Sequence, residues 1–83
     1  MSPREIEQLI KAGIPDAQVV VSGEDGRHFQ AIVVSATFAG KPMVEQHKLV
    51  YRTLGGLMAE AIHALSIRTF TPGEWAAAQP AAR

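Results

Sequence analysis

The sequence of 83 residues predicts an α+β sandwich, with helices packed on a three-stranded mixed sheet in the order α-β-β-α(α)-β-α. Three observations carry this prediction. Segments 17–22, 28–35 and 62–70 are short and rich in β-branched or other apolar residues, which is typical of strands. Apolar residues at helical spacing lie before the first strand and between the second and third. Glycine or proline separates most of these segments.

The first helix is expected over residues 3–12. Positions 2–5 have the form of a capping box, with proline at the first helical position. Its apolar stripe consists of Ile6, Leu9 and Ile10. Gly13 is expected to close the helix in the left-handed conformation, and Pro15 prevents its continuation.

Segments 17–22 and 28–35 are predicted to form an antiparallel hairpin, because turn residues at 23–26 join them. The spacing Gly-x-x-Gly in this turn superficially matches the backbone-clamping loop of KH domains. Here the intervening residues are Glu24 and Asp25, which would repel phosphate, and the loop joins two strands rather than two helices. The turn therefore does not favour nucleic-acid binding.

A long helical pattern follows, with polar residues Glu45, Lys48 and Arg52 on its outer side. The expected buried stripe is Met43, Val50, Leu54, Leu57, Met58 and Ala61, widened by Val44 and Tyr51. Each glycine of the pair at 55–56 costs about 1 kcal/mol in a helix interior relative to alanine, so a kink or a break into two helices is expected there.

The third strand, 62–70, should lie parallel to the second because a right-handed helical crossover joins them. A second capping box at 71–74, again with proline at the first helical position, begins the last helix. Trp75 is expected to close the edge of the core. Residues 1–76 therefore form a single domain, and 77–83 are expected to be a frayed C-terminal tail.

Composition excludes several classes of protein. The chain has no cysteine, so it offers no thiolate for catalysis or for binding iron and sulfide. Eight acidic and eight basic side chains give zero formal charge, whereas a dedicated nucleic-acid binder usually has a basic surplus. No nucleophile–base pair or pair of carboxylates at a suggestive spacing predicts an enzyme. The chain begins with polar residues and has no long apolar run, so we expect a cytoplasmic domain that does not span a membrane.

The sequence resembles the BolA family over nearly its whole length. The matching residues are Val34-Ser35, Phe38-x-Gly40-Lys41, Val44-x-x-His47-x-x-Val50-Tyr51, Leu54, Ile62-His63-Ala64-Leu65-Ser66 and Thr71-Pro72-x-Glu74-Trp75. The short hairpin resembles the shorter bacterial branch of the family. The resemblance implies a KH-like sandwich that pairs with a monothiol glutaredoxin. The pair would share a 2Fe–2S cluster, with ligands from the glutaredoxin cysteine, its glutathione and the BolA-like partner.

The resemblance implies different roles for the three histidines. His63 matches the C-terminal ligand histidine of the family. His28 ends the hairpin loop, where family members carry a second ligand, cysteine or histidine; that histidine lies several residues earlier in a longer loop, but here His28 is the only candidate in the segment. For His47 we favour a structural role in capping or packing its helix. Two histidines cannot hold such a cluster alone, so a partner must supply sulfur, and the isolated chain should carry no cofactor.

The sequence and the resemblance support two candidate functions, a protein adaptor and a DNA-binding regulator. The leading one is a non-enzymatic adaptor in iron–sulfur trafficking or iron-dependent regulation. The alternative is a KH-like DNA-binding transcriptional regulator of stress response and cell morphology, since some members of the family have been regarded in that way. Its basic surface would consist of Lys41, Lys48, Arg52 and Arg68. The sequence leaves open whether DNA is bound and whether the chain forms a homodimer.

Overall fold

The computed structural model describes residues 1–23 and 25–79. Its helices are α1 (Pro3–Gly13), α2 (Met43–Thr53), α3 (Met58–Ala64) and α4 (Pro72–Ala78), with short 3₁₀ turns η1 (Ala36–Phe38) and η2 (Gly55–Leu57). Its strands are β1 (Gln18–Ser22), β2 (Phe29–Val34) and β3 (Leu65–Phe70). None of these helices is long and apolar enough to cross a membrane. The predicted α+β class and element order are confirmed.

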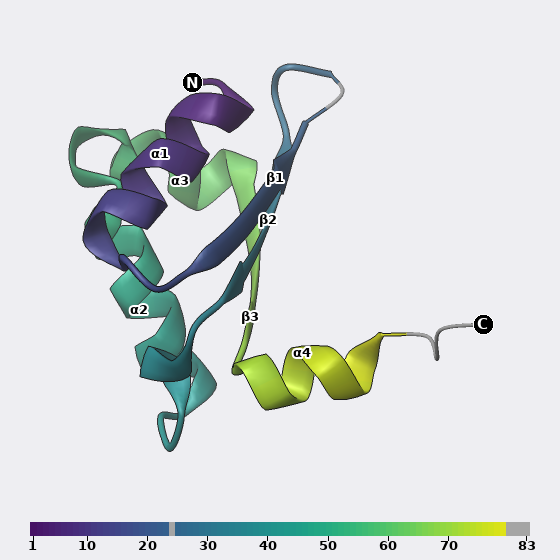
Figure 1. The fold of residues 1–83 in the computed structure, drawn as a ribbon. Helices are drawn as coiled ribbons and strands as arrows, with labels where there is room; N and C mark the ends of the chain where they lie inside the picture. The colour runs from purple at the N-terminus through teal and green to yellow at the C-terminus, as the bar shows by residue number, and fades with distance from the viewer. Residues whose placement is uncertain (24, 80–83) are drawn as a thin grey trace.

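The sheet has the strand order β1-β2-β3. β1 pairs antiparallel with β2, and β2 pairs parallel with β3, so the predicted hairpin and crossover are both confirmed. Helices α1, α2 and α3 cover one face of the sheet (Figure 1). The shorter α4 lies at the other face, where Trp75 packs against Phe70 of β3 with ring centroids 5.0 Å apart.

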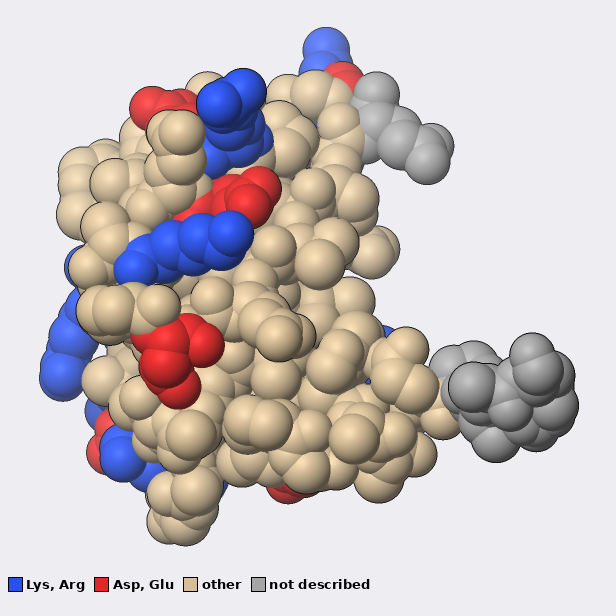
Figure 2. Space-filling view, in the orientation of Figure 1, with Lys and Arg blue, Asp and Glu red and all other residues tan. Residues whose placement is uncertain are grey.

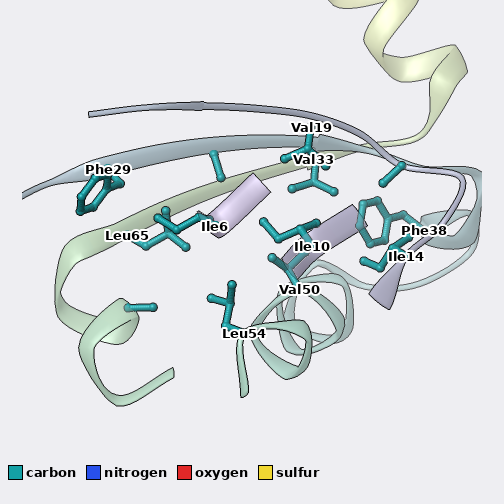
Figure 3. Close-up of a cluster of buried hydrophobic side chains, with 13 residues drawn as sticks. Ile6, Ile10, Ile14, Val19, Phe29, Val33, Phe38, Val50, Leu54 and Leu65 are labelled. Carbon is teal, nitrogen blue, oxygen red and sulfur yellow. The ribbon is translucent and has the colours of Figure 1, made fainter. Parts of the chain in front are cut away.

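The core lies between the sheet and the first three helices (Figure 3). Alternate strand residues point into it, whereas each helix contributes residues three or four apart. Its fully buried side chains include Ile6 and Ile10 of α1, Val33 of β2, Phe38 of η1, and Val50 and Leu54 of α2. Ser35 is also buried, and its hydroxyl donates to Asp16 over 2.7 Å and accepts from the Thr37 amide over 3.0 Å. The loop entering η1 is thus tied to the loop entering β1.

The expected apolar stripe of the long helical segment was partly wrong. Val50, Leu54 and Ala61 are buried, but Met43 is 69% and Met58 is 41% exposed. Met43 is the first residue of α2, and within this helix only Val50 is fully buried. The predicted break at the glycine pair is confirmed: Gly55 has φ of +54° in the turn between α2 and α3, and this break changes the helical phase before Met58.

Three predicted boundaries also differ. Gly13 is the last helical residue rather than a left-handed cap, and Ile14 closes α1 by donating its amide to the Ile10 carbonyl. The third strand begins at Leu65, because α3 continues through residues 62–64. The last helix continues through Ala78, so residues 77–78 of the expected tail are helical, and 80–83 lie outside the described residues. Both predicted N-terminal serine and threonine caps are confirmed, by Ser2 and Thr71.

Candidate metal-ligand site

The hairpin loop and the junction between α3 and β3 lie at the same end of the sheet (Figure 1). The parallel register pairs Phe29, the first residue of β2, with Leu65, the first residue of β3. Both side chains are buried, which anchors the two strand starts side by side, about 5 Å apart. His28 directly precedes Phe29, and His63 lies two residues before Leu65. The fold therefore brings the two histidines singled out from the sequence to one end of the domain.

His28 is held in place by Asp25 in the hairpin loop. Oδ1 of Asp25 accepts from the backbone amides of Arg27 and His28 over 2.9 and 2.8 Å. Its Oδ2 lies 2.9 Å from Nδ1 of the His28 ring. Gly26 has φ of +69°, which the tight turn between Asp25 and Arg27 requires. The His28 side chain remains 76% exposed.

The carboxylate of Asp25 is strongly stabilised in its charged form. Its pKa is held well below the usual aspartate range, first by the backbone amide of His28, then by the His28 ring and the amide of Arg27. Around it lies an open depression of about 410 Å³, lined by Ser22, Gly23, Asp25, His28 and Gln30. His63 is not among the lining residues, so the two histidines share an end of the sheet but not this depression.

His63 occupies the last turn of α3 and is exposed, contrary to its predicted place at the start of a strand. Two contacts fix the backbone behind it. Ala61 is fully buried, and its carbonyl accepts from the amide of Leu65. The hydroxyl of Tyr51 on α2 donates to the carbonyl of Leu65 over 3.4 Å. Ile62, the residue before His63, is also exposed, by 53%.

The side chains at this end can supply imidazole nitrogens but no thiolate. Within residues 1–23 and 25–79, no three histidine, cysteine, aspartate or glutamate side chains are grouped so that they could hold a metal ion. A 2Fe–2S cluster needs two further ligands for each iron beyond the bridging sulfides, and these are normally thiolates. The donor set therefore fits such a cluster only as one half of a shared site.

His47 lies on α2 and is half-buried. The neighbouring Gln46 links α2 to the loop before it and to β3 through side-chain hydrogen bonds. Its Nε2 donates to the carbonyls of Phe38 and Lys41 over 3.2 and 2.8 Å, and its Oε1 accepts from the hydroxyl of Thr69 over 2.5 Å. The half-buried position of His47 agrees with a packing role, which stays a prediction.

The four basic residues of the alternative function do not form one surface. Lys48 and Arg52 lie one helical turn apart on α2, with Lys41 in the loop before that helix. Arg68 belongs to β3 and points to the opposite face of the sheet, where its guanidinium lies 5.4 Å from the centre of the Phe70 ring. On the face shown in Figure 2, basic and acidic side chains alternate.

Asp25 is the residue at this site whose role sequence reasoning missed. In the sequence, its negative charge was interpreted only as evidence that the hairpin turn does not bind phosphate. The signal was nevertheless present, because an aspartate followed by glycine often forms a turn in which its carboxylate accepts from amides two and three residues later. Met58, which the periodicity assigned to the buried stripe, and Ile62, which it assigned to a strand, instead lie exposed one turn apart on α3 beside His63.

The protein is thus a small α+β sandwich with a three-stranded mixed sheet and two exposed histidines at one end of that sheet. The chain belongs to the BolA family, since the family described as BolA-like protein matches residues 10–74. It is similar to the acid stress protein IbaG of Escherichia coli K12, with 40% identity over 77 residues that cover 92% of this chain and 90% of that protein.

Two further similarities bear on fold and function. The structure of a BolA homologue from Coxiella burnetii superposes with a TM-score of 0.79 at 40% identity, covering 92% of this chain and 97% of that one. The DNA-binding transcriptional regulator BolA of Escherichia coli K12 is 29% identical over 84 residues, which cover 90% of this chain and 80% of that protein. These relatives carry the names of a stress protein and a regulator, not of enzymes.

Proposed function

We propose that this chain is a non-enzymatic cytoplasmic adaptor that pairs with a monothiol glutaredoxin and shares a 2Fe–2S cluster with it, in iron–sulfur trafficking or iron-dependent regulation. The observation that carries the proposal is the placement of His28 and His63. Both are exposed at one end of the sheet, where the buried pair Phe29 and Leu65 holds their backbones together. The partner would supply the thiolates of its cysteine and of glutathione, which this cysteine-free chain lacks.

The surface around the two histidines suits a protein partner. The hairpin loop projects beyond the sheet at this end (Figure 1), and the exposed side chains of Met58 and Ile62 on α3 offer apolar area on the helix that carries His63. The buried centre of a protein contact is more apolar than its rim, and methionine is enriched there. We infer that the partner contacts the hairpin loop, the end of α3 and the start of β3.

Co-expression with a monothiol glutaredoxin tests the proposal. We expect a coloured complex that depends on glutathione, and chemical-shift changes in this chain concentrated at the hairpin loop and the α3–β3 junction. The opposite end of the sheet, marked by α4, serves as the internal control. Colourless proteins that elute separately, or shift changes confined to α1, would contradict the proposal.

DNA binding is the second candidate, favoured by the name of one relative, the DNA-binding transcriptional regulator BolA. Against it stand the zero formal charge and the position of Arg68 on the other face of the sheet from Lys48 and Arg52. Phosphate contacts make affinity fall steeply with salt. Binding at low salt that weakens steeply with added salt, and that is lost in a Lys48→Ala, Arg52→Ala double variant, would favour this candidate. Absence of binding at low salt would exclude it.

A further inference from the structure

Asp25 makes more hydrogen bonds than its turn requires. The turn itself uses only Oδ1, which accepts from the amides of Arg27 and His28. Oδ2 is left over, and it lies 2.9 Å from Nδ1 of the His28 imidazole. A turn aspartate with no further role would leave Oδ2 to water. Here the same carboxylate fixes both the backbone of the loop and the ring at its end.

We propose that Asp25 is a positioning residue that keeps the proton of the neutral His28 ring on Nδ1 and so leaves the lone pair of Nε2 free to bind a metal ion. Insofar as the metal belongs to a cluster shared with a partner, the inference rests on the proposed function. The position of the proton on the His28 ring does not depend on that function, because Asp25 and His28 belong to the same chain.

The chemistry of the two groups leads to this assignment. An ionised carboxylate only accepts hydrogen bonds, and an exposed aspartate such as Asp25 is ionised at neutral pH, a form that the two loop amides donating to its Oδ1 also favour. The ring nitrogen beside it must therefore donate. A neutral imidazole carries one proton, so a proton on Nδ1 makes Nε2 the acceptor.

The position of the ring makes Nε2 available. The His28 side chain is 76% exposed and borders the open depression at the end of the hairpin. A carboxylate behind the ring also raises the basicity of the ligating nitrogen and fixes its direction. Loss of such a carboxylate typically lowers metal affinity by about 10- to 100-fold.

Asp25→Asn provides a sharp test, because the amide is close to the carboxylate in shape. Its oxygen can still accept from the amides of Arg27 and His28, so the turn is kept. Its NH₂ group then faces Nδ1 and donates, which moves the proton of the ring to Nε2. Glu7→Gln on α1 is the matched control, since it removes the same charge from a carboxylate that pairs with Lys11, on a different element.

The tautomer is read by long-range ¹H–¹⁵N correlation spectra of the free protein, at a pH where imidazoles are neutral. We expect a protonated Nδ1 and an unprotonated Nε2 for His28 in the wild type and in Glu7→Gln, and the reverse in Asp25→Asn. Unchanged amide shifts of Arg27 and His28 would show that the turn is intact. A wild-type ring protonated on Nε2, or the same tautomer in wild type and Asp25→Asn, would overturn the proposal.

Titration with Ni²⁺ alone then tests the ligating atom. We expect line broadening at His28 to need about tenfold more Ni²⁺ in Asp25→Asn than in the wild type, with His47 unchanged between them as the internal reference. Equal affinity at His28 in both proteins would overturn the role of Asp25 in metal binding. Neither measurement contains a glutaredoxin. A failure of the proposed function, seen as no coloured complex with the wild type, is therefore distinct from a failure of this inference.

Discussion

Gly13→Ala should destabilise the protein, although helix propensity alone predicts the opposite. Alanine is favoured over glycine within a helix by about 1 kcal/mol, and Gly13 is the last residue of α1. However, a Cβ at position 13 would lie 2.5 Å from Cγ2 and 2.9 Å from Cβ of Thr53 at the end of α2. Glycine is therefore required here by the close approach of two helices.

The structure shows why the neighbouring side chain cannot move aside cheaply. The hydroxyl of Thr53 donates to the Val50 carbonyl over 2.6 Å, which fixes its rotamer and directs its methyl group toward Gly13. The Cβ of Thr53 moves only with the backbone, so α1 and α2 must separate. Overpacking costs about 1–3 kcal/mol, and because two contacts fall below 3.0 Å and one of them is to a Cβ atom, we take the upper part of that range, about 2–3 kcal/mol, from which the gain in propensity of about 1 kcal/mol is subtracted. We expect a net loss of about 1–2 kcal/mol and a Tm lower by about 5–15 °C.

Urea unfolding followed by circular dichroism measures the effect, with two comparison variants. Gly56→Ala is the control, because nothing lies within 4 Å of a Cβ built at that position, and we expect a change within about 0.5 kcal/mol. Thr53→Ser removes the methyl group and keeps the hydroxyl, so it should recover part of the loss in the double variant. A Gly13→Ala protein as stable as the wild type would refute the reasoning.

Four further predictions concern His63, His47, the isolated chain and the effect of acid on stability. His63→Ala should change stability by less than about 0.5 kcal/mol, because the residue is exposed, yet lose the cluster or shift its absorption in the glutaredoxin complex. His47→Ala should lower stability by about 1 kcal/mol and leave that spectrum alone. The chain purified without a partner should be colourless and contain neither iron nor sulfide in stoichiometric amount. Stability should fall as the pH drops below the usual aspartate range, because the hydrogen bond from Ser35 lowers the pKa of Asp16 in the folded state.

The predictions for His63 and Asp16 can each be refuted by one measurement. An unchanged absorption and circular-dichroism spectrum of the His63→Ala complex would show that the ligand assignment is wrong. For Asp16, protonation is unfavourable only in the folded protein, so the stabilisation is present above the usual aspartate range and is lost toward lower pH. Urea midpoints at about pH 6 and about pH 3 measure this loss, and Asp16→Asn should reduce it. An equal acid effect in both proteins would exclude Asp16 as its source.

Local signals in the sequence were enough to predict the elements and their order. The serine and threonine caps, the β-branched runs and the glycine pair at 55–56 act over a few residues, and each predicted its element, although β3 begins three residues later than the pattern placed it. The parallel pairing of β2 and β3 also followed from the sequence, because a helical crossover between strands of one sheet permits few arrangements. The absence of cysteine was likewise evident without a structure, and it means that the chain has no thiolate of its own to offer a metal.

Tertiary structure decided the features that depend on contacts between distant residues. No local pattern distinguishes Met43 from Val50, and only the position at which α2 reaches the sheet exposes one and buries the other. The start of β3 moved to Leu65 because this residue pairs with Phe29, which leaves His63 in the helix. Periodicity describes one element at a time, whereas register and packing are properties of elements that meet only in the fold.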